Sequence, residues 1–258
     1  MKKKAIIALV GVFLALSAAV LAGTVYRDGT IRLIYGSVQA KDAEFTYDIE
    51  SDGTATITGV KNPKKLRGNV TIPAEIDGYM VKKAEDPVID VSNKDFITGV
   101  TVSEGIERLG FGFFAGAKNL FKVSIPNSVK SIGQFAFYGC KEYESIKVSD
   151  GLTYVDGCLV AATTRDKDVK IEDGTRIIAS GAFWSADEIE KIYIPESVEY
   201  IGTLDLCNLE SLESVTVDEN NKTYMSKGTC IVEKKTGKVI EQFERKYKNK
   251  SGYKTVDG

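Results

Sequence analysis

Val123-Ser-Ile-Pro-Asn-Ser-Val-Lys-Ser-Ile-Gly-Gln-Phe-Ala-Phe-Tyr-Gly-Cys140 is the stretch that decides the fold. Short β-type segments like its first three residues recur every 23 residues, starting at Val100, Val123, Ile146, Val169, Ile192 and Val215. A fixed period in this range is the signature of a solenoid, in which each repeat forms one coil. Such a coil cannot bury its own apolar face, so the stack of coils supplies the core. The sequence therefore predicts a β-rich solenoid with a short strand and a turn or short helix in each coil.

Apolar side chains recur at three places in each repeat. The first column consists of alternate strand residues: Val100 and Val102, Val123 and Ile125, Ile146 and Val148, Val169 and Ile171, Ile192 and Ile194, Val215 and Val217. The second column is Leu109, Ile132, Val155, Ile178 and Ile201, and the third is Phe114, Phe137, Val160, Phe183 and Leu206. Glycine follows the second column at Gly110, Gly133 and Gly202. We expect these glycines to form a turn that a Cβ would obstruct.

A hairpin is predicted before the repeats. The segments 45–49 and 55–58 alternate apolar and polar residues on either side of Ser51-Asp52-Gly53-Thr54. Asp-Gly between alternating segments is a strong hairpin signal. We expect this hairpin to be an N-terminal cap that covers the open edge of the first coil. That coil starts at Val70 but is degenerate, because residues 85–98 break the repeat pattern.

Two later segments, Thr153–Val160 and Thr223–Val232, also have the pattern of hairpins and are predicted to replace the usual part of a coil. In chain order, the predicted organisation is a signal peptide (1–22), a linker (23–44), the N-terminal cap with the degenerate first coil (45–98), the solenoid (99–240) and a polar C-terminal tail (241–258).

The N-terminus has the pattern of an export signal. Lys2-Lys3-Lys4 precedes an apolar run, and Val20-Leu21-Ala22 is a small-residue cleavage site. The uncharged stretch continues to Tyr26, which is long enough to span a bilayer, so an uncleaved anchor is the alternative to a cleaved signal. Either case predicts a secreted or cell-surface protein, which contacts the membrane only if the segment is left uncleaved.

The composition excludes several kinds of chemistry. The 258 residues contain no histidine, which excludes Ser-His-Asp and Cys-His catalysis and zinc sites with histidine ligands. The formal net charge is −2, so the basic footprint of a nucleic-acid binder is missing. We predict no catalytic residue, metal or cofactor. For Cys140, Cys158, Cys207 and Cys230 we favour buried thiols, with a Cys158–Cys230 disulfide left open.

The outward residues of the strands are the predicted contact surface. With coils about 4.8 Å apart, one exposed row is formed by Thr101, Ser124, Lys147, Lys170, Tyr193 and Thr216. Adjacent Lys147 and Lys170 beside Tyr193 would suit an anionic partner or a sugar ring, although an ordinary solvated sheet face has the same composition. A second row, Glu104, Asp150, Asp173, Glu196 and Glu219, could bind Ca²⁺, but acidic residues are common in turns, and we favour the turn interpretation.

The repeat pattern IPxxVxxIGxxAF, complete in residues 125–137 and continued in Ile192–Gly202 and Ser180–Phe183, resembles the leucine-rich repeat of BspA-like bacterial surface proteins over residues 45–240. The chain departs from the pattern at Asp205, where Ala is expected, and at Thr175, where Val is expected. The resemblance implies a leucine-rich-repeat solenoid, export, and binding of host proteins or other cells.

These observations together predict an exported, non-enzymatic adhesion protein that contacts a host or cell-surface protein through the exposed strands. The partner is an extracellular macromolecule and not a nucleic acid, and the chain is expected to be a monomer. The alternative is a module that binds polysaccharide or cell wall, and an enzyme built on the same scaffold is the third hypothesis.

Overall fold

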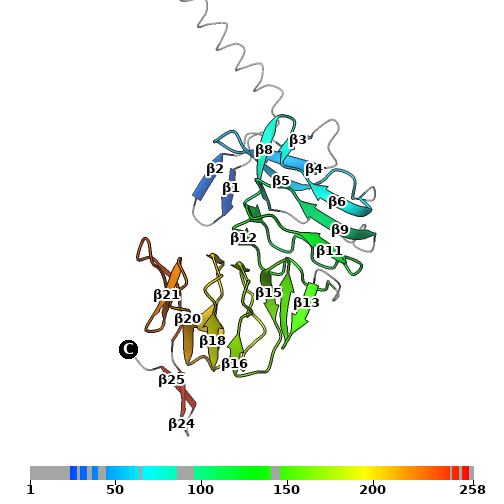
Figure 1. Cartoon of the computed structure of the whole chain (residues 1–258). Coiled ribbons are helices and arrows are strands. Elements are labelled where there is room, and N and C mark those ends of the chain that lie inside the picture. Colours follow the sequence, from blue (N-terminus) through cyan, green and yellow to red (C-terminus); the bar gives the residue numbers. More distant parts are fainter. Residues whose placement is uncertain are drawn as a thin grey trace, which may run out of the picture.

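The structure is a computed structural model, and it describes residues 24–27, 30–33, 37–39, 45–63, 66–85, 96–140, 146–244, 246–249 and 252–255. The predicted signal peptide, residues 1–22, lies outside this part of the chain. The fold is a solenoid of short strands and turns, as the 23-residue period predicts (Figure 1). Its coils contain almost no helix, and the short helices that the sequence allowed are replaced by turns. The 3-10 helix η2, Leu206–Asn208, is an exception.

The strands that begin successive coils are here named the strand row. The first half of this row is a parallel sheet of three strands. They are β6 (Gly68–Ile72), β9 (Ile97–Val102) and β11 (Lys122–Ser124). Val70 pairs with Val100, and Val100 with Val123, so the degenerate first coil is in register with the repeats. These three valines are buried, because alternate strand residues face the inside of the coil.

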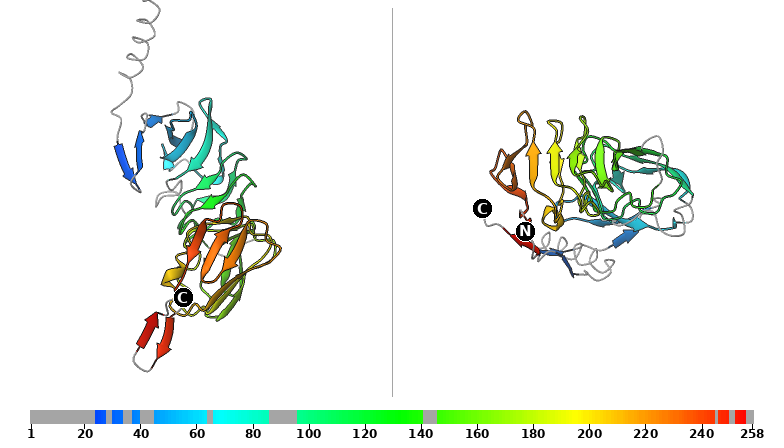
Figure 2. Two further views of the ribbon diagram at one scale, coloured as in Figure 1. Left: turned by 90° about the vertical axis from the view of Figure 1, so that its left-hand side faces the viewer. Right: turned by 90° about the horizontal axis from the view of Figure 1, so that it is seen from below.

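The second half of the row is another parallel sheet. It contains β16 (Asp168–Lys170), β18 (Lys191–Ile194) and β20 (Ser214–Val217), which lie side by side in the right-hand view of Figure 2. Val169, Ile192 and Val215 are in register and buried. In Figure 1 this sheet runs in a different direction from the first one.

The strand row is interrupted between these two sheets. β13 (Ile146–Ser149) pairs antiparallel with β14 (Leu152–Val155), which pairs antiparallel with β15 (Cys158–Ala162). The predicted hairpin at Thr153–Val160 is therefore confirmed, but the prediction that β13 continues the row is wrong. Because β13 folds back on its own chain, Val148 is 41% exposed and does not belong to the first column.

A second set of short strands contains the residues of the second apolar column. β8 (Tyr79–Ala84), β10 (Arg108–Leu109) and β12 (Ser131–Ile132) are parallel to one another, and so are β15, β17 (Ile177–Ile178) and β19 (Tyr200–Ile201). In the latter set Leu159 pairs with Ile178. The assignment of Val155 to this column was wrong, since the hairpin places Leu159 there instead.

The ends of the chain carry antiparallel pairs. The predicted N-terminal hairpin is observed as β4 (Phe45–Ile49) and β5 (Ala55–Val60), and β5 lies parallel to β8. The hairpin predicted at Thr223–Val232 is observed as β21 and β22, followed by β23. The remaining strands are β1 (Thr24–Arg27), β2 (Thr30–Leu33), β3 (Ser37–Gln39), β7 (Glu75–Ile76), β21 (Tyr224–Lys227), β22 (Cys230–Glu233), β23 (Val239–Gln242), β24 (Lys246–Asn249) and β25 (Gly252–Thr255). Short strands thus lie within the predicted linker and the predicted tail.

The third column forms the centre of the coils. Its members, all at most 8% exposed, are Phe114, Phe137, Val160, Phe183 and Leu206. The ring centroids of Phe114 and Phe137 are 5.0 Å apart, in successive coils. The predicted ladder of stacked apolar side chains is confirmed for this column. The buried residues divide into two clusters, one containing Phe114 and the other containing Phe183.

The repeated glycines allow neighbouring coils to approach closely. A Cβ on Gly110 would lie 2.0 Å from the carbonyl oxygen of Glu85, and a Cβ on Gly133 would lie 2.4 Å from the carbonyl carbon of Gly110. A Cβ on Gly202 would lie 2.6 Å from the backbone nitrogen of Ser180. None of these glycines has a positive φ. A Cβ is therefore obstructed at these positions, as predicted, and the obstruction comes from the backbone of the neighbouring coil.

The interrupted coil brings its two neighbours into contact. The Arg176 guanidinium donates to the carbonyl oxygens of Val129, at 2.6 Å, and Pro126, at 3.2 Å. The backbone N–H of Ser180 donates to the carbonyl oxygen of Ile132 at 2.9 Å. Since residues 146–162 form a local hairpin, the coil that starts at Val169 packs partly against the coil that starts at Val123.

Candidate functional site

The structure divides the predicted contact row into two parts. Thr101 pairs with Ser124 in the first sheet. In the second sheet Lys170 pairs with Tyr193, and Tyr193 with Thr216. Lys147 belongs to neither part, because it pairs with Tyr154 in the β13–β14 hairpin. The prediction that Lys147 and Lys170 are neighbours in one row was therefore wrong.

The second part of the row, Lys170–Tyr193–Thr216, is here named the strand face. The Lys170 ammonium lies 5.4 Å from the centroid of the Tyr193 ring, within range of a cation–π interaction. The Tyr193 hydroxyl donates to the Asp218 carboxylate. This hydrogen bond raises the pKa of Tyr193 to about 12 and lowers the pKa of Asp218. A hollow of about 440 Å³ is lined by the three side chains of the strand face together with neighbouring residues of β16, β18 and β20.

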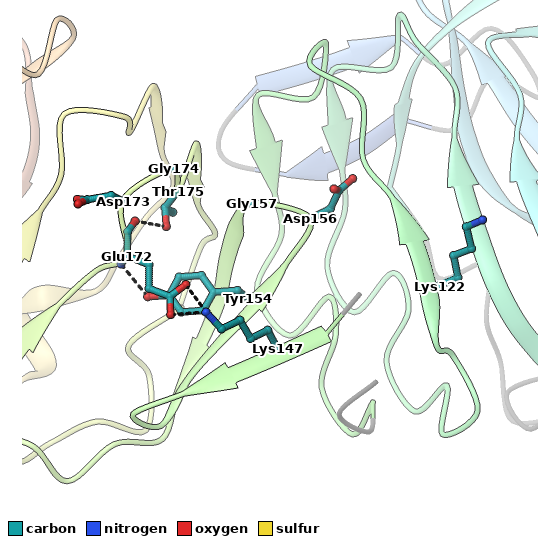
Figure 3. Close-up of a pocket in the computed structure, with 9 residues that line it drawn as sticks. All are labelled: Lys122, Lys147, Tyr154, Asp156, Gly157, Glu172, Asp173, Gly174 and Thr175. Carbon is teal, nitrogen blue, oxygen red and sulfur yellow. Dashed lines mark hydrogen bonds and ion pairs between the residues drawn. The ribbon is translucent and has the colours of Figure 1, made fainter. Parts of the chain in front are cut away.

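A second hollow, of about 540 Å³, lies where the strand row is interrupted, and is here named the junction hollow (Figure 3). It is formed by β11, the β13–β15 hairpin and the turn after β16. Its lining residues are Lys122, Lys147, Tyr154, Asp156, Gly157, Glu172, Asp173, Gly174 and Thr175. The hollow exists because β13 leaves the row and opens a gap beside β11.

An ion pair occupies one side of the junction hollow. The Lys147 ammonium lies 2.7 and 2.9 Å from the two carboxylate oxygens of Glu172, and Figure 3 shows both side chains beside Tyr154. The hydrogen bond from Lys147 lowers the pKa of Glu172. The Tyr154 hydroxyl accepts the backbone N–H of Glu172 at 3.1 Å, and burial raises the pKa of Tyr154 to about 12. Lys147 is therefore paired with a carboxylate, whereas the sequence analysis placed it next to Lys170 in a surface for an anionic partner or a sugar ring.

The opposite side of the hollow carries Asp156 and Lys122. Asp156 Oδ2 accepts the backbone N–H of Ile125 at 2.6 Å, which satisfies a donor at the open edge of β11. Lys122 is exposed on β11, apart from the Lys147–Glu172 pair (Figure 3). The sequence analysis missed both residues. The Asp156-Gly157 dipeptide, which is typical of tight hairpin turns, was the available signal.

The described residues contain no cluster of metal ligands, and two of the cysteines have raised pKa values. No group of three or more Asp, Glu or Cys side chains in this part of the chain is placed to hold a metal ion, and the acidic row includes no such group. All four cysteines are free, including Cys158 and Cys230, but the prediction of buried thiols holds for Cys158 alone, because Cys207 is exposed and Cys140 and Cys230 are half-buried. Burial raises the pKa of Cys140 and Cys158 to about 12, so neither is a thiolate nucleophile near neutral pH. The site offers charged groups, hydroxyls and an aromatic ring, which are suited to binding.

Within the described part of the chain, no helix is long and apolar enough to cross a membrane.

Comparisons with known proteins identify the repeat. The family model of the BspA type leucine rich repeat region matches residues 107–228 in six copies. Among solved structures, the chain is similar to the leucine rich repeat protein of T. pallidum, with a TM-score of 0.40 and 20% identity, covering 70% of this chain and 71% of that one. No curated protein matches the sequence.

Two further solved structures are similar to the chain. One is a leucine rich cell surface protein of Faecalibacterium prausnitzii, with a TM-score of 0.39 and 22% identity, covering 77% of this chain and 59% of that one. The other is the pneumococcal vaccine antigen PcpA, with a TM-score of 0.36 and 15% identity, covering 78% of this chain and 54% of that one. The chain thus spans between half and two thirds of the length of these two proteins.

Proposed function

We propose that this chain, whose residues 107–228 match the BspA type leucine rich repeat region, is an exported, non-enzymatic adhesion protein. Its partner is a host or cell-surface protein, bound by a monomer through the strand face and the neighbouring junction hollow. The observation that carries the proposal is the register of Lys170, Tyr193 and Thr216 on one exposed sheet.

The side chains of the strand face suit a protein partner. Tyrosine is enriched in protein interfaces because its ring supplies contact area and its hydroxyl supplies a hydrogen bond. Tyr193 is held in place by Lys170 on its ring and by Asp218 at its hydroxyl, so little side-chain freedom is lost on binding. The ion pair of Lys191 with Asp168, 3.3 Å apart, adds charged groups of both signs at the edge. A repeated rigid surface of this kind binds through many modest contacts.

The proposal is tested by surface plasmon resonance of the full chain over a panel of immobilised matrix and plasma proteins. We expect one protein of the panel to bind, and the double variant Lys170→Ala, Tyr193→Ala to bind at least about tenfold more weakly, a loss of about 1.4 kcal/mol. The matched control is Lys235→Ala, an exposed lysine in the turn between β22 and β23. Unchanged binding by the double variant would exclude the strand face.

Export is tested separately. Mass spectrometry of the protein recovered from the producing cell's medium or surface should give an N-terminus at Gly23 if the signal is cleaved at the small-residue site. Recovery of the whole protein from the cytoplasm would contradict export.

Polysaccharide binding at the strand face is the second candidate, supported by the ring of Tyr193. The Lys170 ammonium lies over that ring and would compete with a sugar for it, since a sugar also packs against a ring face. The protein partner is therefore favoured at this site. A glycan array probed with the full chain separates the two, because Tyr193→Ala would abolish array binding only if the sugar stacks there.

A further inference from the structure

Four aromatic side chains gather outside the strand face. The ring centroid of Phe135 lies 5.6 Å from that of Phe111, 5.9 Å from that of Tyr138 and 6.1 Å from that of Trp184. Phe111, Tyr138 and Trp184 are 55%, 72% and 54% exposed. These four residues are here named the aromatic cluster. Single exposed aromatic residues are ordinary, but a contiguous exposed group of them marks an interaction site.

The aromatic cluster borders a hollow of about 270 Å³, here named the aromatic hollow, which is just below the usual size range of small-ligand sites and so suits a single small unit. Phe135, Tyr138 and Trp184 line it, and none of its described lining residues is charged. Four residues with hydroxyl groups are among its lining residues, Tyr138, Thr153, Thr163 and Ser185, and the Thr163 hydroxyl also donates to the carbonyl oxygen of Gly151 at 3.3 Å. The hollow therefore combines aromatic rings with neutral groups that both donate and accept hydrogen bonds.

The backbone of Phe135 is strained. Its φ is 60°, in the left-handed region, where a bulky side chain is an outlier. The residues one repeat before and two repeats after it are Gly112 and Gly181, with φ of 60° and 64°. Glycine adopts this conformation without a steric penalty. A phenylalanine at a position that suits glycine costs stability, and strain of this kind is typical of functional sites.

Gln134 adds an unsatisfied group beside the hollow. Its Nε2 is buried and, among the described residues, is the one buried side-chain polar atom without a hydrogen-bond partner. The side chain lies directly against Gly181, which lines the aromatic hollow. Buried donors are normally paired, so this amide calls for an explanation. If the amide turned toward the hollow, a ligand oxygen could accept its hydrogen bond.

We propose that the aromatic hollow binds a neutral sugar unit of an extracellular polysaccharide. A pyranose has an apolar C–H face that packs on an aromatic ring, and hydroxyls around its edge that donate and accept. The rings of Tyr138 and Trp184 supply the first surface. Thr153 and Ser185, which line the same hollow, carry hydroxyls that can donate and accept, and the Thr163 hydroxyl can accept. Because the lining is uncharged, it offers no cation to pair with an anionic sugar. The hollow therefore favours a neutral sugar.

A proline-rich peptide is the competing occupant, since such segments also dock in aromatic grooves. Proline has no N–H and its carbonyl only accepts, so the acceptor capacity of the hydroxyls at Thr153, Thr163 and Ser185 would stay unused. Sugar hydroxyls use both capacities, and the hollow therefore favours a sugar.

The sugar site does not depend on the proposed protein-binding function. Neighbouring residues of β14 separate the two places: Thr153 lines the aromatic hollow, and Tyr154 lines the junction hollow. No described residue lines both hollows. The two proposals can thus be tested independently with separate variants.

The test is a titration of the full chain with three neutral oligosaccharides, cellohexaose, mannohexaose and hexa-N-acetylchitohexaose, and with a heparin hexasaccharide as the anionic comparison. Trp184 is the single tryptophan of the chain and lines the hollow, so its fluorescence reports on binding. We expect a saturable change with at least one neutral oligosaccharide and none with the heparin hexasaccharide.

Two variants place the binding at the hollow. Tyr138→Ala should weaken it at least about tenfold without harming the fold, because Tyr138 is 72% exposed. Phe135→Gly should weaken it by a similar factor while the urea midpoint stays close to that of the wild type, since relief of backbone strain offsets the lost ring contacts. A merely structural role for Phe135 would instead lower the midpoint and leave the oligosaccharide affinity unchanged.

The matched controls are Phe121→Ala, an exposed aromatic residue outside the hollow, and Tyr193→Ala on the strand face. Both should bind the oligosaccharide as the wild type does. The proposal is overturned if no neutral oligosaccharide gives a saturable change at millimolar concentration, or if Tyr138→Ala binds as tightly as the wild type. Saturable binding of a proline-rich decapeptide in place of the sugars would also overturn it. So would a dimer in sedimentation that Tyr138→Ala dissociates.

Discussion

The stacked phenylalanines give the sharpest test of the core. Phe114 is fully buried, and its ring centroid lies 4.8 Å from that of Phe113 and 5.0 Å from that of Phe137. An aromatic side chain buries about 150–250 Å². At about 25 cal/mol per Å² this is worth about 4–6 kcal/mol, an upper bound because the unfolded chain already hides part of that area. We therefore expect Phe114→Ala to lower the free energy of unfolding by about 4–5 kcal/mol.

Phe137→Ala should cost less, about 3 kcal/mol, although the same atoms are removed. Phe137 lines the aromatic hollow, so the space left by its ring opens into that hollow and can be filled by water or by neighbouring side chains. The space left by Phe114 has no such outlet, since it is enclosed by two coils. The matched control is Phe121→Ala, which is 44% exposed and should change the free energy of unfolding by about 0.5 kcal/mol or less.

The measurement is equilibrium unfolding in urea, followed by far-UV circular dichroism and by Trp184 fluorescence. The two signals should give the same midpoint, which shows that the coils unfold together and that a single free energy is defined. The slope with urea should be equal in all variants, since it reports the surface exposed on unfolding. A loss below about 1 kcal/mol for Phe114→Ala, or equal losses for Phe114→Ala and Phe121→Ala, would refute the stacked column.

Three further predictions concern glycine, cysteine and pH. Gly133→Ala should lower the free energy of unfolding by about 1–3 kcal/mol in the urea experiment, because its Cβ would overlap the preceding coil; a loss below about 0.5 kcal/mol would mean that the coils can move apart. With a thiol reagent at pH 8, exposed Cys207 should react rapidly and buried Cys158 only after unfolding, and rapid labelling of both would contradict the burial. Burial, with a nearby carboxylate, raises the pKa of Glu241, which means that the folded state binds its proton more tightly and loses stability as the pH rises through that pKa. Glu241→Gln should therefore stabilise the protein at pH 7, and the gain should vanish below pH 4; a gain that persists there would have another cause.

The buried columns could be predicted from the sequence because a solenoid is stabilised by contacts between neighbouring coils. Every coil meets the same environment one period away, so the same residue types recur, as Phe114 and Phe137 do one repeat apart. The position of the glycines could also be predicted. The reason for the glycines could not be predicted, because only the tertiary structure shows that the backbone of the preceding coil lies against Gly133.

The binding sites could be predicted only in part. Lys170, Tyr193 and Thr216 lie in register as the period indicated. The pairing of Lys147 with Glu172 and the contact of Phe135 with Trp184 were not predicted. Both follow from the interrupted coil. Lys147 and Glu172 are 25 residues apart, about one repeat, whereas Phe135 and Trp184 lie two repeats apart in the sequence.

The sequence by itself determined the period, the third buried column and the hairpins. Each of these depends on local sequence patterns or on the stacking of equivalent residues in neighbouring coils. Only the tertiary structure decided where the row breaks. Asp150-Gly151 and Asp173-Gly174 are the same dipeptide one period apart, yet both residues of the first are left-handed, with φ of 50° and 74°, and only Gly174 is left-handed in the second. The first forms a tight hairpin because β14 is available as a pairing partner, and the second continues the solenoid because its strand pairs with the next coil. Which partner a strand finds is a property of the whole fold, and it is this choice that opens the junction hollow and assembles the aromatic cluster.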